Sequence, residues 1–307
     1  MFRNAIISKA AELGFSQCGF APCEPLENLR FFYNDFVLKK RFGALQYLER
    51  YAEPRLNPEL LLPGARTVIC VTMNYHPAEQ ISGNDNFIIA KYAYGYDYHR
   101  LMRERMDCLV GFMRSAFGDI LARAFVDSGN VLEKAWAQQC GIGWQGKNTL
   151  VINKSRGSFF FIGIILTDLV IKPDHPETNH CGECEQCVKA CPTGALDTPY
   201  QLNIPRCISY LTIENRMEIQ DDLKDKLNDR IYGCDICQDV CPYNRIPIAH
   251  SIPEFLPSAW LMKMRKKDWI SLTEQQFDQH FTRSPMKRNG YAGLMKNIRA
   301  NQRSRSQ

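Results

Sequence analysis

The chain has 307 residues and a formal net charge of +5, a length that predicts one large core with a smaller one beside it. It contains thirteen cysteines, but its first twenty residues do not resemble a signal peptide, which argues against a secreted protein held together by disulfides. The longest apolar stretch, residues 159–166, is too short to span a bilayer as a helix. We therefore predict a cytoplasmic protein without a membrane anchor.

The first 170 residues alternate helix and strand patterns. An amphipathic helix is predicted at the start, with Ile6 and Ala10 on its apolar face and Gly14 as its stop. Residues 65–75 are rich in Val, Ile and Thr, which predicts a buried strand. Asp97 is a candidate N-cap for a long amphipathic helix that runs to Phe117.

A second group of elements follows this helix. Residues 122–126 read as a strand, and a helix is predicted near Asn130, with Glu133 at the spacing of a capping box. The strands 149–152 and 158–167 are expected to pair as a hairpin. We therefore predict an N-terminal α/β domain over residues 1–172, in a chain whose overall class is α+β or α/β. Later helices are expected at 204–213, 221–231 and 271–281.

Eight of the cysteines lie between Cys181 and Cys241, in two runs with the ligand spacing of bacterial ferredoxins. In the two-cluster arrangement, the fourth cysteine of each run binds the cluster of the other run. This spacing predicts two 4Fe–4S clusters within a ferredoxin-like domain over residues 173–249. The first cluster would be held by Cys181, Cys184, Cys187 and Cys241, and the second by Cys191, Cys234, Cys237 and, as the candidate for the missing ligand, Cys207.

Zinc is the alternative for such cysteines, because structural zinc sites also use paired C-x2-C motifs. Two features favour clusters. Both runs end in C-x3-C-P, and there are eight ligands rather than four.

The stretch from Gly141 to Asn148 contains three glycines in a G-x-G-x-x-G pattern followed by Lys147. A dinucleotide fingerprint needs a strand before it and a helix after it, and here the predicted order is reversed. A Walker loop is excluded by the spacing. Two interpretations remain: a turn that needs positive φ, or a close approach of the backbone to a large planar ligand with polar contacts from Lys147 and Asn148.

Asp127 follows the predicted strand 122–126 and precedes a Ser-Gly-Asn turn. A carboxylate there commonly caps a turn or a helix. The alternative is a general acid, which would need a raised pKa to hold a proton near neutral pH. The sequence alone leaves both interpretations open.

The last part of the chain, 250–307, is predicted to be a short helical and basic segment. From Gln279 onward it has no acidic residue. Such a run is either a solvated tail or a surface that binds phosphates of a nucleic acid. The basic residues that would contact a nucleic acid are Arg283, Lys287, Arg288 and Lys296.

Taken together, these segments resemble the epoxyqueuosine reductases, cobalamin-dependent iron–sulfur enzymes of the last step of queuosine synthesis in tRNA. The resemblance extends over nearly the whole chain. Besides both cysteine runs, it is carried by Pro54-Arg55 with Leu60-Leu61-Leu62-Pro63, Asp97-Tyr98-His99, Phe125-Val126-Asp127-Ser128, Gly141 to Asn148, Gly157-Ser158, Arg206-Cys207-Ile208-Ser209-Tyr210-Leu211-Thr212, Tyr232-Gly233-Cys234-Asp235 and Arg288-Asn289.

The resemblance implies a cobalamin in the N-terminal domain, reduced to cob(I) by a nearby cluster. It implies that Asp127 donates the proton that lets the epoxide oxygen leave. It further implies a tRNA anticodon stem-loop as substrate, with a monomeric enzyme fed by an external low-potential electron donor. The positions that it assigns to cobalamin are Arg55, Tyr98, Asp127, Lys147, Asn148 and, as a weaker addition, Ser209.

Cobalamin enzymes with a histidine on cobalt use D-x-H-x-x-G, whereas Asp97-Tyr98-His99 is followed by Met102 at the glycine position. We therefore expect no histidine ligand to cobalt. Many members of the family continue into C-terminal helical repeats, and this chain resembles a short form without them. Two other classes remain: a reductive dehalogenase-like enzyme, against which the lack of a twin-arginine signal counts, and a plain ferredoxin-type carrier, which would not need the first 170 residues.

Overall fold

The computed structural model describes residues 2–81, 85–127 and 129–303, so Ser128 of the motifs above lies outside the described residues. The chain divides into two compact units. The first unit comprises Met1–Asn74 and Tyr98–Cys184, and the second comprises Tyr75–Asp97 and Glu185–Gln307. Among the described helices, none combines the length and the apolar character that a membrane span needs.

The first unit contains a sheet with helices on both faces. Its elements are α1 (Phe2–Glu12), β1 (Gln17–Pro22), α2 (Glu27–Leu38), α3 (Tyr47–Arg50), α4 (Ala52–Leu56), η1 (Pro58–Leu60), β2 (Thr67–Asn74), α5 (Tyr98–Phe117), β4 (Ala122–Phe125), α6 (Glu133–Gln139), β5 (Trp144–Gln145), β6 (Val151–Ile152) and β7 (Phe160–Thr167).

The sheet of the first unit has the strand order β1-β2-β7-β4. All three pairings are antiparallel, with Gln17 opposite Thr72, Thr67 opposite Thr167, and Ala122 also opposite Thr167. The predicted mixture of helices and strands is therefore confirmed. The expected class, α+β or α/β, did not fix the strand directions, and the structure shows that they are antiparallel.

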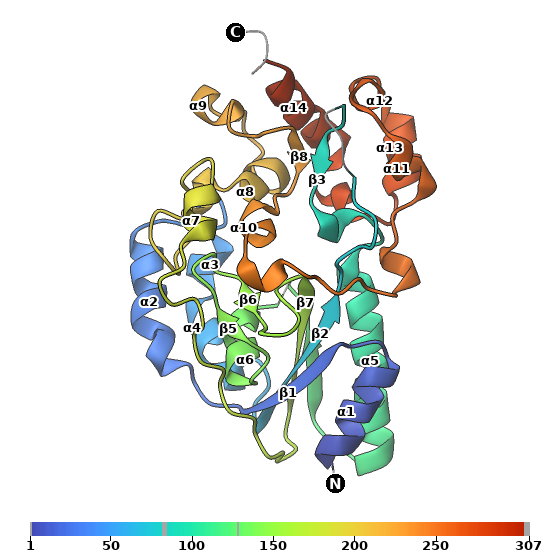
Figure 1. Ribbon diagram of the computed structural model, residues 1–307. Helices are drawn as coiled ribbons and strands as arrows, with labels where there is room; N and C mark the ends of the chain where they lie inside the picture. The colour runs from blue at the N-terminus through green and yellow to red at the C-terminus, as the bar shows by residue number, and fades with distance from the viewer. Residues whose placement is uncertain (1, 82–84, 128, 304–307) are drawn as a thin grey trace. The chain divides into compact units, whose positions relative to one another are not determined.

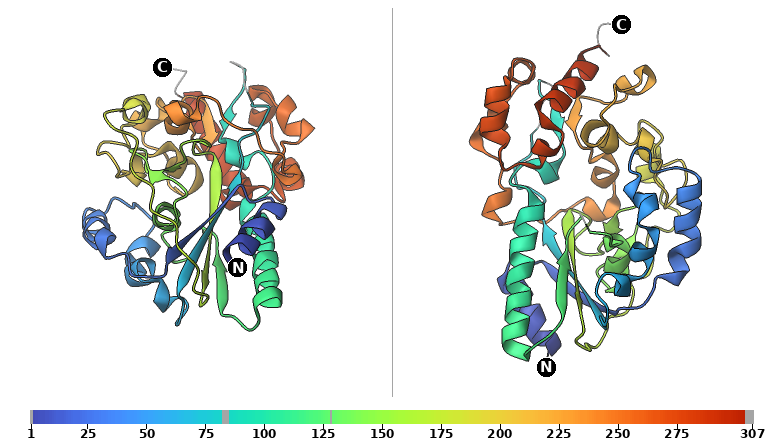
Figure 2. Two further views of the ribbon diagram at one scale, coloured as in Figure 1. Left: turned by 60° about the horizontal axis from the view of Figure 1, so that its bottom comes forward. Right: turned by 180° about the vertical axis from the view of Figure 1, so that it is seen from behind.

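Helices cover both faces of this sheet, with α1 and α5 on one side and α6 with the β5–β6 hairpin on the other (Figures 1 and 2). This arrangement explains why the central strand β2 is buried at seven of its eight positions, because a strand covered on both faces has no solvent side. Helix α1 buries Ile6 and Ala10, as predicted, and Gly14 follows it with a φ of 83°.

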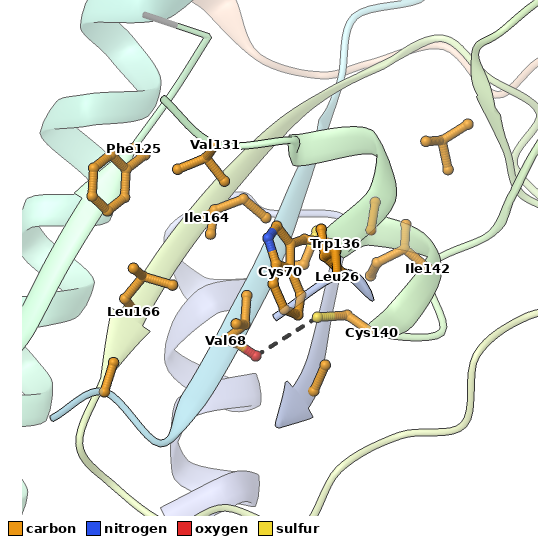
Figure 3. Close-up of a cluster of buried hydrophobic side chains, with 14 of the residues drawn as sticks. Leu26, Val68, Cys70, Phe125, Val131, Trp136, Cys140, Ile142, Ile164 and Leu166 are labelled. Carbon is orange, nitrogen blue, oxygen red and sulfur yellow. Dashed lines mark hydrogen bonds between the residues drawn. The ribbon is translucent and has the colours of Figure 1, made fainter. Parts of the chain in front are cut away.

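The core between α6 and the sheet is shown in Figure 3. Trp136 of α6 lies among Val68, Cys70 and Ile164 of the sheet, and the Cys140 thiol donates a 3.6 Å hydrogen bond to the Val68 carbonyl. This packing fixes α6 against the strands. The same packing also fixes the start of α6. Glu133 lies at this start, a few residues after the end of β4 in the sequence.

The predicted hairpin of strands 149–152 and 158–167 is confirmed only at its turn, where Asn153 and Gly157 form an antiparallel bridge, and the strands themselves pair elsewhere. The strand β6 pairs with β5 instead, with Trp144 opposite Ile152, while β7 joins the large sheet. Residues 153–157 form a loop in which the Asn153 carboxamide oxygen accepts hydrogen bonds from the backbone of Ser155 and Arg156. This Asx-type turn separates β6 from β7.

The second unit is mainly helical. Its elements are β3 (Ile88–Ile89), η2 (Lys91–Ala93), α7 (Gln186–Ala190), η3 (Ile204–Arg206), α8 (Ile208–Ile213), α9 (Asp221–Lys224), β8 (Arg230–Tyr232), α10 (Ile236–Asp239), η4 (Pro242–Asn244), η5 (Pro253–Phe255), α11 (Ala259–Lys263), α12 (Lys266–Ile270), α13 (Glu274–Phe281), η6 (Pro285–Arg288) and α14 (Gly290–Arg303).

Helix α14 packs on β8 and α8 and completes the core of the second unit. Asn297 of this helix is fully buried and donates hydrogen bonds to the carbonyls of Thr212 and Ile231. The parallel pair β3–β8 joins residues 75–97 to the rest of this unit. The domain boundaries predicted from the sequence, at 172/173 and 249/250, left residues 75–97 inside the N-terminal domain.

Three helix predictions for the second unit need correction. The helix predicted over 221–231 ends at Lys224, because Asn228 and Asp229 have positive φ and lead into β8. The segment 204–213 is divided into η3 and α8, with Cys207 in an extended conformation between them. Helix α13 begins at Glu274, and its capping box is formed by Thr273 and Gln276 rather than by Ser271 and Glu274.

Candidate active site and cluster-binding segment

Asp127 lies directly beyond β4 and has a φ of 49°, in the left-handed region that aspartate tolerates better than most residues. Its side chain is 58% exposed, and its Oδ2 lies 2.9 Å from Nε2 of His99. His99 belongs to the first turn of α5. The structure therefore orients this carboxyl with a histidine that is 28 residues away in the sequence.

Aromatic stacking holds the histidine ring in place. The rings of His99 and Tyr98 are stacked at 4.1 Å, and the Tyr98 ring stacks in turn on Phe161 of β7 at 3.9 Å with an interplanar angle of 4°. Stacked rings resist rotation about their side-chain bonds. The helix start and the sheet together therefore fix the position of His99 Nε2 beside Asp127. Sequence reasoning considered His99 only as a cobalt ligand and missed this role.

A second charged group of the site is Arg55 of α4. Its side chain is buried, its guanidinium lies 5.4 Å from the centre of the Tyr47 ring, and its Nη2 lies 3.5 Å from Oδ1 of Asn130. Its Nε has no hydrogen-bond partner among the described residues. Asn130 was predicted to begin a helix, but α6 begins at Glu133, preceded by Leu132 at the cap position without a side-chain cap bond.

Glu133 is half-buried, and the charges of Asp127 and Arg55 both act on its carboxyl. Burial and, to a smaller extent, the nearby Asp127 carboxylate raise its pKa from the ordinary value of 4.5 to about 7, against the lowering effects of a backbone hydrogen bond, Arg55 and Lys134. Its Oε1 is buried and has no hydrogen-bond partner among the described residues. In the sequence, Glu133 has the spacing of a capping-box residue. That spacing predicts a role at the surface of the helix start rather than in the site.

Lys147 and Asn148 lie in the tight turn between β5 and β6, and both are buried. The Asn148 Oδ1 accepts a hydrogen bond from the backbone of Leu150, and the Lys147 ammonium makes no ion pair with any described residue. Of the three glycines before them, only Gly141 has a positive φ, of 68°. A Cβ on Gly143 would lie 2.2 Å from the Ile152 carbonyl oxygen. Close packing of the hairpin therefore accounts for Gly143 without a ligand.

Gly143→Ala is expected to lower the free energy of unfolding by about 1–3 kcal/mol, because the added methyl group would force apart the two strands of the hairpin. Gly111→Ala in α5 is the matched control. A Cβ there meets nothing within 4 Å, and alanine is the better helix former, so this variant should gain about 0.5–1 kcal/mol. Thermal unfolding of both variants measures the difference, and equal melting temperatures would contradict it.

The first cysteine of the predicted cluster ligands is connected to this hairpin. The indole N–H of Trp144 in β5 donates a 3.4 Å hydrogen bond to the Cys181 sulfur. Hydrogen bonds to cluster sulfurs are one of the factors that set the potential of an iron–sulfur cluster. Trp144 is fully buried and Cys181 is half-buried, so this contact is partly buried.

Three of the cysteines predicted for the second cluster lie close together in the second unit. Burial, with a smaller contribution from the charge of Cys207, raises the pKa of Cys234 to about 12 and that of Cys237 well above its ordinary value. Thiolates crowded in this way need positive charge beside them, which iron supplies. No group of three or more His, Cys, Asp or Glu side chains within the described ranges is arranged around a single metal ion.

Two family models match the chain. Residues 180–244 match a 4Fe-4S double cluster binding domain, and residues 55–128 match the family described as epoxyqueuosine reductase QueG, DUF1730. The epoxyqueuosine reductase of Cellulophaga algicola is 42% identical over 295 residues, which cover 96% of this chain and 96% of that one. This chain belongs to the epoxyqueuosine reductase family.

Solved structures of epoxyqueuosine reductases agree with this assignment. The Bacillus subtilis enzyme, in a structure with an aspartate catalytic loop swung out of the active site, matches with a TM-score of 0.89 and 30% identity, covering 97% of this chain and 80% of that one. An epoxyqueuosine reductase with an epoxyqueuosine-modified tRNA stem loop matches with a TM-score of 0.87, at 30% identity and the same coverage. A catabolic reductive dehalogenase shares the fold alone, with a TM-score of 0.53 and 15% identity over 78% of this chain and 31% of its own.

In this member of the epoxyqueuosine reductase family, the four basic residues predicted to contact tRNA all make contacts within the described part of the chain. Lys296 is buried, and its ammonium donates to the carbonyls of Asn215 and Met217. Lys287 is paired with Asp278 at 2.8 Å, and Arg288 is paired with Glu214 at 2.6 Å. Arg283 is exposed, with its guanidinium 5.3 Å from the centre of the Tyr96 ring. These contacts give Lys296 a structural role and make Arg283 the better candidate for a phosphate contact.

Proposed function

We propose that this protein reduces epoxyqueuosine to queuosine in the anticodon loop of tRNA. The observation that carries the proposal is the Asp127–His99 pair, an exposed carboxyl held at the end of a sheet strand by a histidine 2.9 Å away. Removing the epoxide oxygen as water requires two electrons and two protons. Asp127 is the acid in this scheme, and the double-cluster segment over residues 180–244 is the route for the electrons.

The residues of the site fit cobalamin, which carries many polar amide groups around its ring. Arg55 has a buried Nε without a described partner, and Lys147 and Asn148 present polar groups from one short turn. We therefore propose that Arg55, Lys147 and Asn148 bind cobalamin, together with Tyr98 and, less directly, Ser209. When bound, cobalamin would supply the electrons from its reduced cobalt. We expect no histidine on this cobalt, because Nε2 of His99 lies beside Asp127.

The proton chemistry follows from the arrangement of Asp127 and His99. Asp127 in its acid form gives its proton to the epoxide oxygen as the carbon–oxygen bond breaks, since an alkoxide is a poor leaving group until it is protonated. The carboxylate that remains is stabilised by the hydrogen bond to Nε2 of His99.

The ligands of the two clusters remain as the spacing predicts. We propose that Cys181, Cys184, Cys187 and Cys241 hold the first cluster, and that Cys191, Cys207, Cys234 and Cys237 hold the second. The mutual electrostatic effects of Cys207, Cys234 and Cys237 support the second set. An external low-potential donor would supply the electrons. We expect the protein to act as a monomer, and its substrate places it in the cytoplasm with tRNA.

For tRNA binding, we expect Arg283→Gln to weaken affinity for the anticodon stem-loop and to reduce the slope of log affinity against log salt by about 1, the effect of losing one phosphate contact. Arg30→Gln is the matched control, because that arginine is already paired with Glu27 and Glu53. Binding titrations at several salt concentrations make the measurement. An unchanged slope for Arg283→Gln would remove this residue from the interface.

The function itself is tested by the nucleosides of cellular tRNA. A strain that lacks this protein should accumulate epoxyqueuosine in its tRNA and lose queuosine, and the wild-type gene should restore queuosine. If queuosine is unchanged in the deletion strain, and no second reductase is present, the proposal is refuted. A dehalogenase or a simple electron carrier would leave these nucleosides unaffected.

A further inference from the structure

The first turn of α6 and the residues around it contain three buried polar atoms that lack hydrogen-bond partners among the described residues. They are Oε1 of Glu133, Nε1 of Trp136 and Nε of Arg55. Glu133 and Trp136 are three residues apart in the same helix, so their side chains lie on one face of α6. Buried polar atoms are nearly always satisfied, so a group of unsatisfied ones marks a functional position rather than an ordinary core.

Glu133 is the only carboxylic acid among these three residues. Four titratable groups around it interact with it electrostatically. Asp127 and Arg55 lie close enough to act on it electrostatically, Lys134 follows it in α6, and the Cys70 thiol of β2 lies within its electrostatic range. Burial favours the neutral, proton-bearing form of a carboxyl. The Asp127 side chain is 58% exposed, whereas Oε1 of the half-buried Glu133 is itself shielded from solvent, so the two carboxyls have opposite preferences for holding a proton.

We propose that Glu133 is a positioning residue that holds a proton for Asp127 and restores the acid form of Asp127 after each proton transfer. The O–H bond of Glu133 breaks and an O–H bond forms on Asp127, directly or through one water, and solvent then returns a proton to Glu133. This accounts for the second of the two protons in the reduction. The inference rests on the proposed function, because it needs Asp127 to be consumed as an acid in every turnover.

The kinetic test uses Glu133→Gln, which keeps the shape of the side chain but cannot exchange a proton. With the reconstituted enzyme, kcat at pH 7 should fall about tenfold, below the usual range for a direct acid because Glu133 acts through Asp127. The wild-type kcat should fall as the pH rises through about 7, because Glu133 then loses its proton. The pH profile of the variant should lack this fall. Glu133→Asp should restore part of the rate.

The matched control is Glu274→Gln. Glu274 is also the first residue of a helix, α13, but it is exposed. Its substitution should leave the pH profile unchanged. If Glu133→Gln keeps the wild-type pH limb while Asp127→Asn is inactive, this inference fails alone. If the wild-type enzyme produces no queuosine, the proposed function has failed instead.

A second measurement does not depend on activity. The pKa of Glu133 is raised in the folded protein, so the folded protein binds this proton more tightly than the unfolded chain does. The resulting stability is fully present below pH 4.5 and is lost as the pH rises through about 7. The melting temperature of wild type should therefore fall relative to that of Glu133→Gln between about pH 5 and about pH 8. Parallel curves over this range would overturn the assignment of a proton to Glu133.

Discussion

Asp127→Asn is expected to lower the rate of queuosine formation by about 10²–10⁴-fold, the range for loss of a positioned general acid. Asparagine has nearly the same shape and retains a polar contact with His99, but its amide cannot give a proton to the epoxide oxygen. Cluster content, cobalamin absorption and affinity for the tRNA stem-loop should all stay at wild-type levels. Single-turnover assays with the reduced enzyme would measure the chemical step.

Asp107→Asn provides the control for this variant. Asp107 is exposed on α5, the helix that carries His99, so the same chemical change is made away from the site. It should react at the wild-type rate. A wild-type rate for Asp127→Asn as well would show that the proton comes from another group and would remove the basis for the role of Glu133.

Cys207→Ser is expected to cost the protein one of its two clusters. The purified variant should contain half the iron and half the acid-labile sulfide of wild type, and turnover should be abolished because the electron route is broken. The physical reason is the position of Cys207 between η3 and α8, where its charge acts on both Cys234 and Cys237. Anaerobic reconstitution followed by metal analysis and electron paramagnetic resonance would measure both effects.

Serine sometimes replaces cysteine as an iron ligand, so Cys207→Ala should be prepared in parallel and should show the same loss. Cys108→Ser is the control, because Cys108 is exposed on α5 and outside both cysteine runs. It should retain the full iron content. If both variants at position 207 keep the full complement, another ligand completes the second cluster.

The parts of the site that could be predicted from the sequence are those with local signals. The cysteine runs place ligands at short, fixed spacings, and the strand before Asp127 could be recognised from a few apolar residues. The glycine stretch was correctly separated from nucleotide-binding loops, because its order relative to helix and strand is also local.

The parts that could not be predicted depend on contacts between distant segments. His99 and Asp127 meet only after α5 and β4 have packed together, and nothing at either position signals the other. The burial of Glu133 depends on how α6 lies on the sheet, whereas its spacing from Asn130 suggested an exposed cap. Lys296 belonged to a run that looked like a basic surface, yet α14 packs into the core and places its ammonium on backbone carbonyls.

The central claim is that this protein reduces epoxyqueuosine on tRNA. The most direct test incubates the anaerobically reconstituted protein, with both clusters and cobalamin bound, with an epoxyqueuosine-modified tRNA stem-loop and a low-potential reductant. The digested nucleosides are then separated by chromatography. We predict that epoxyqueuosine is converted to queuosine with wild type and is left unchanged with Asp127→Asn. Unchanged epoxyqueuosine with fully loaded, reduced wild-type protein would contradict the account.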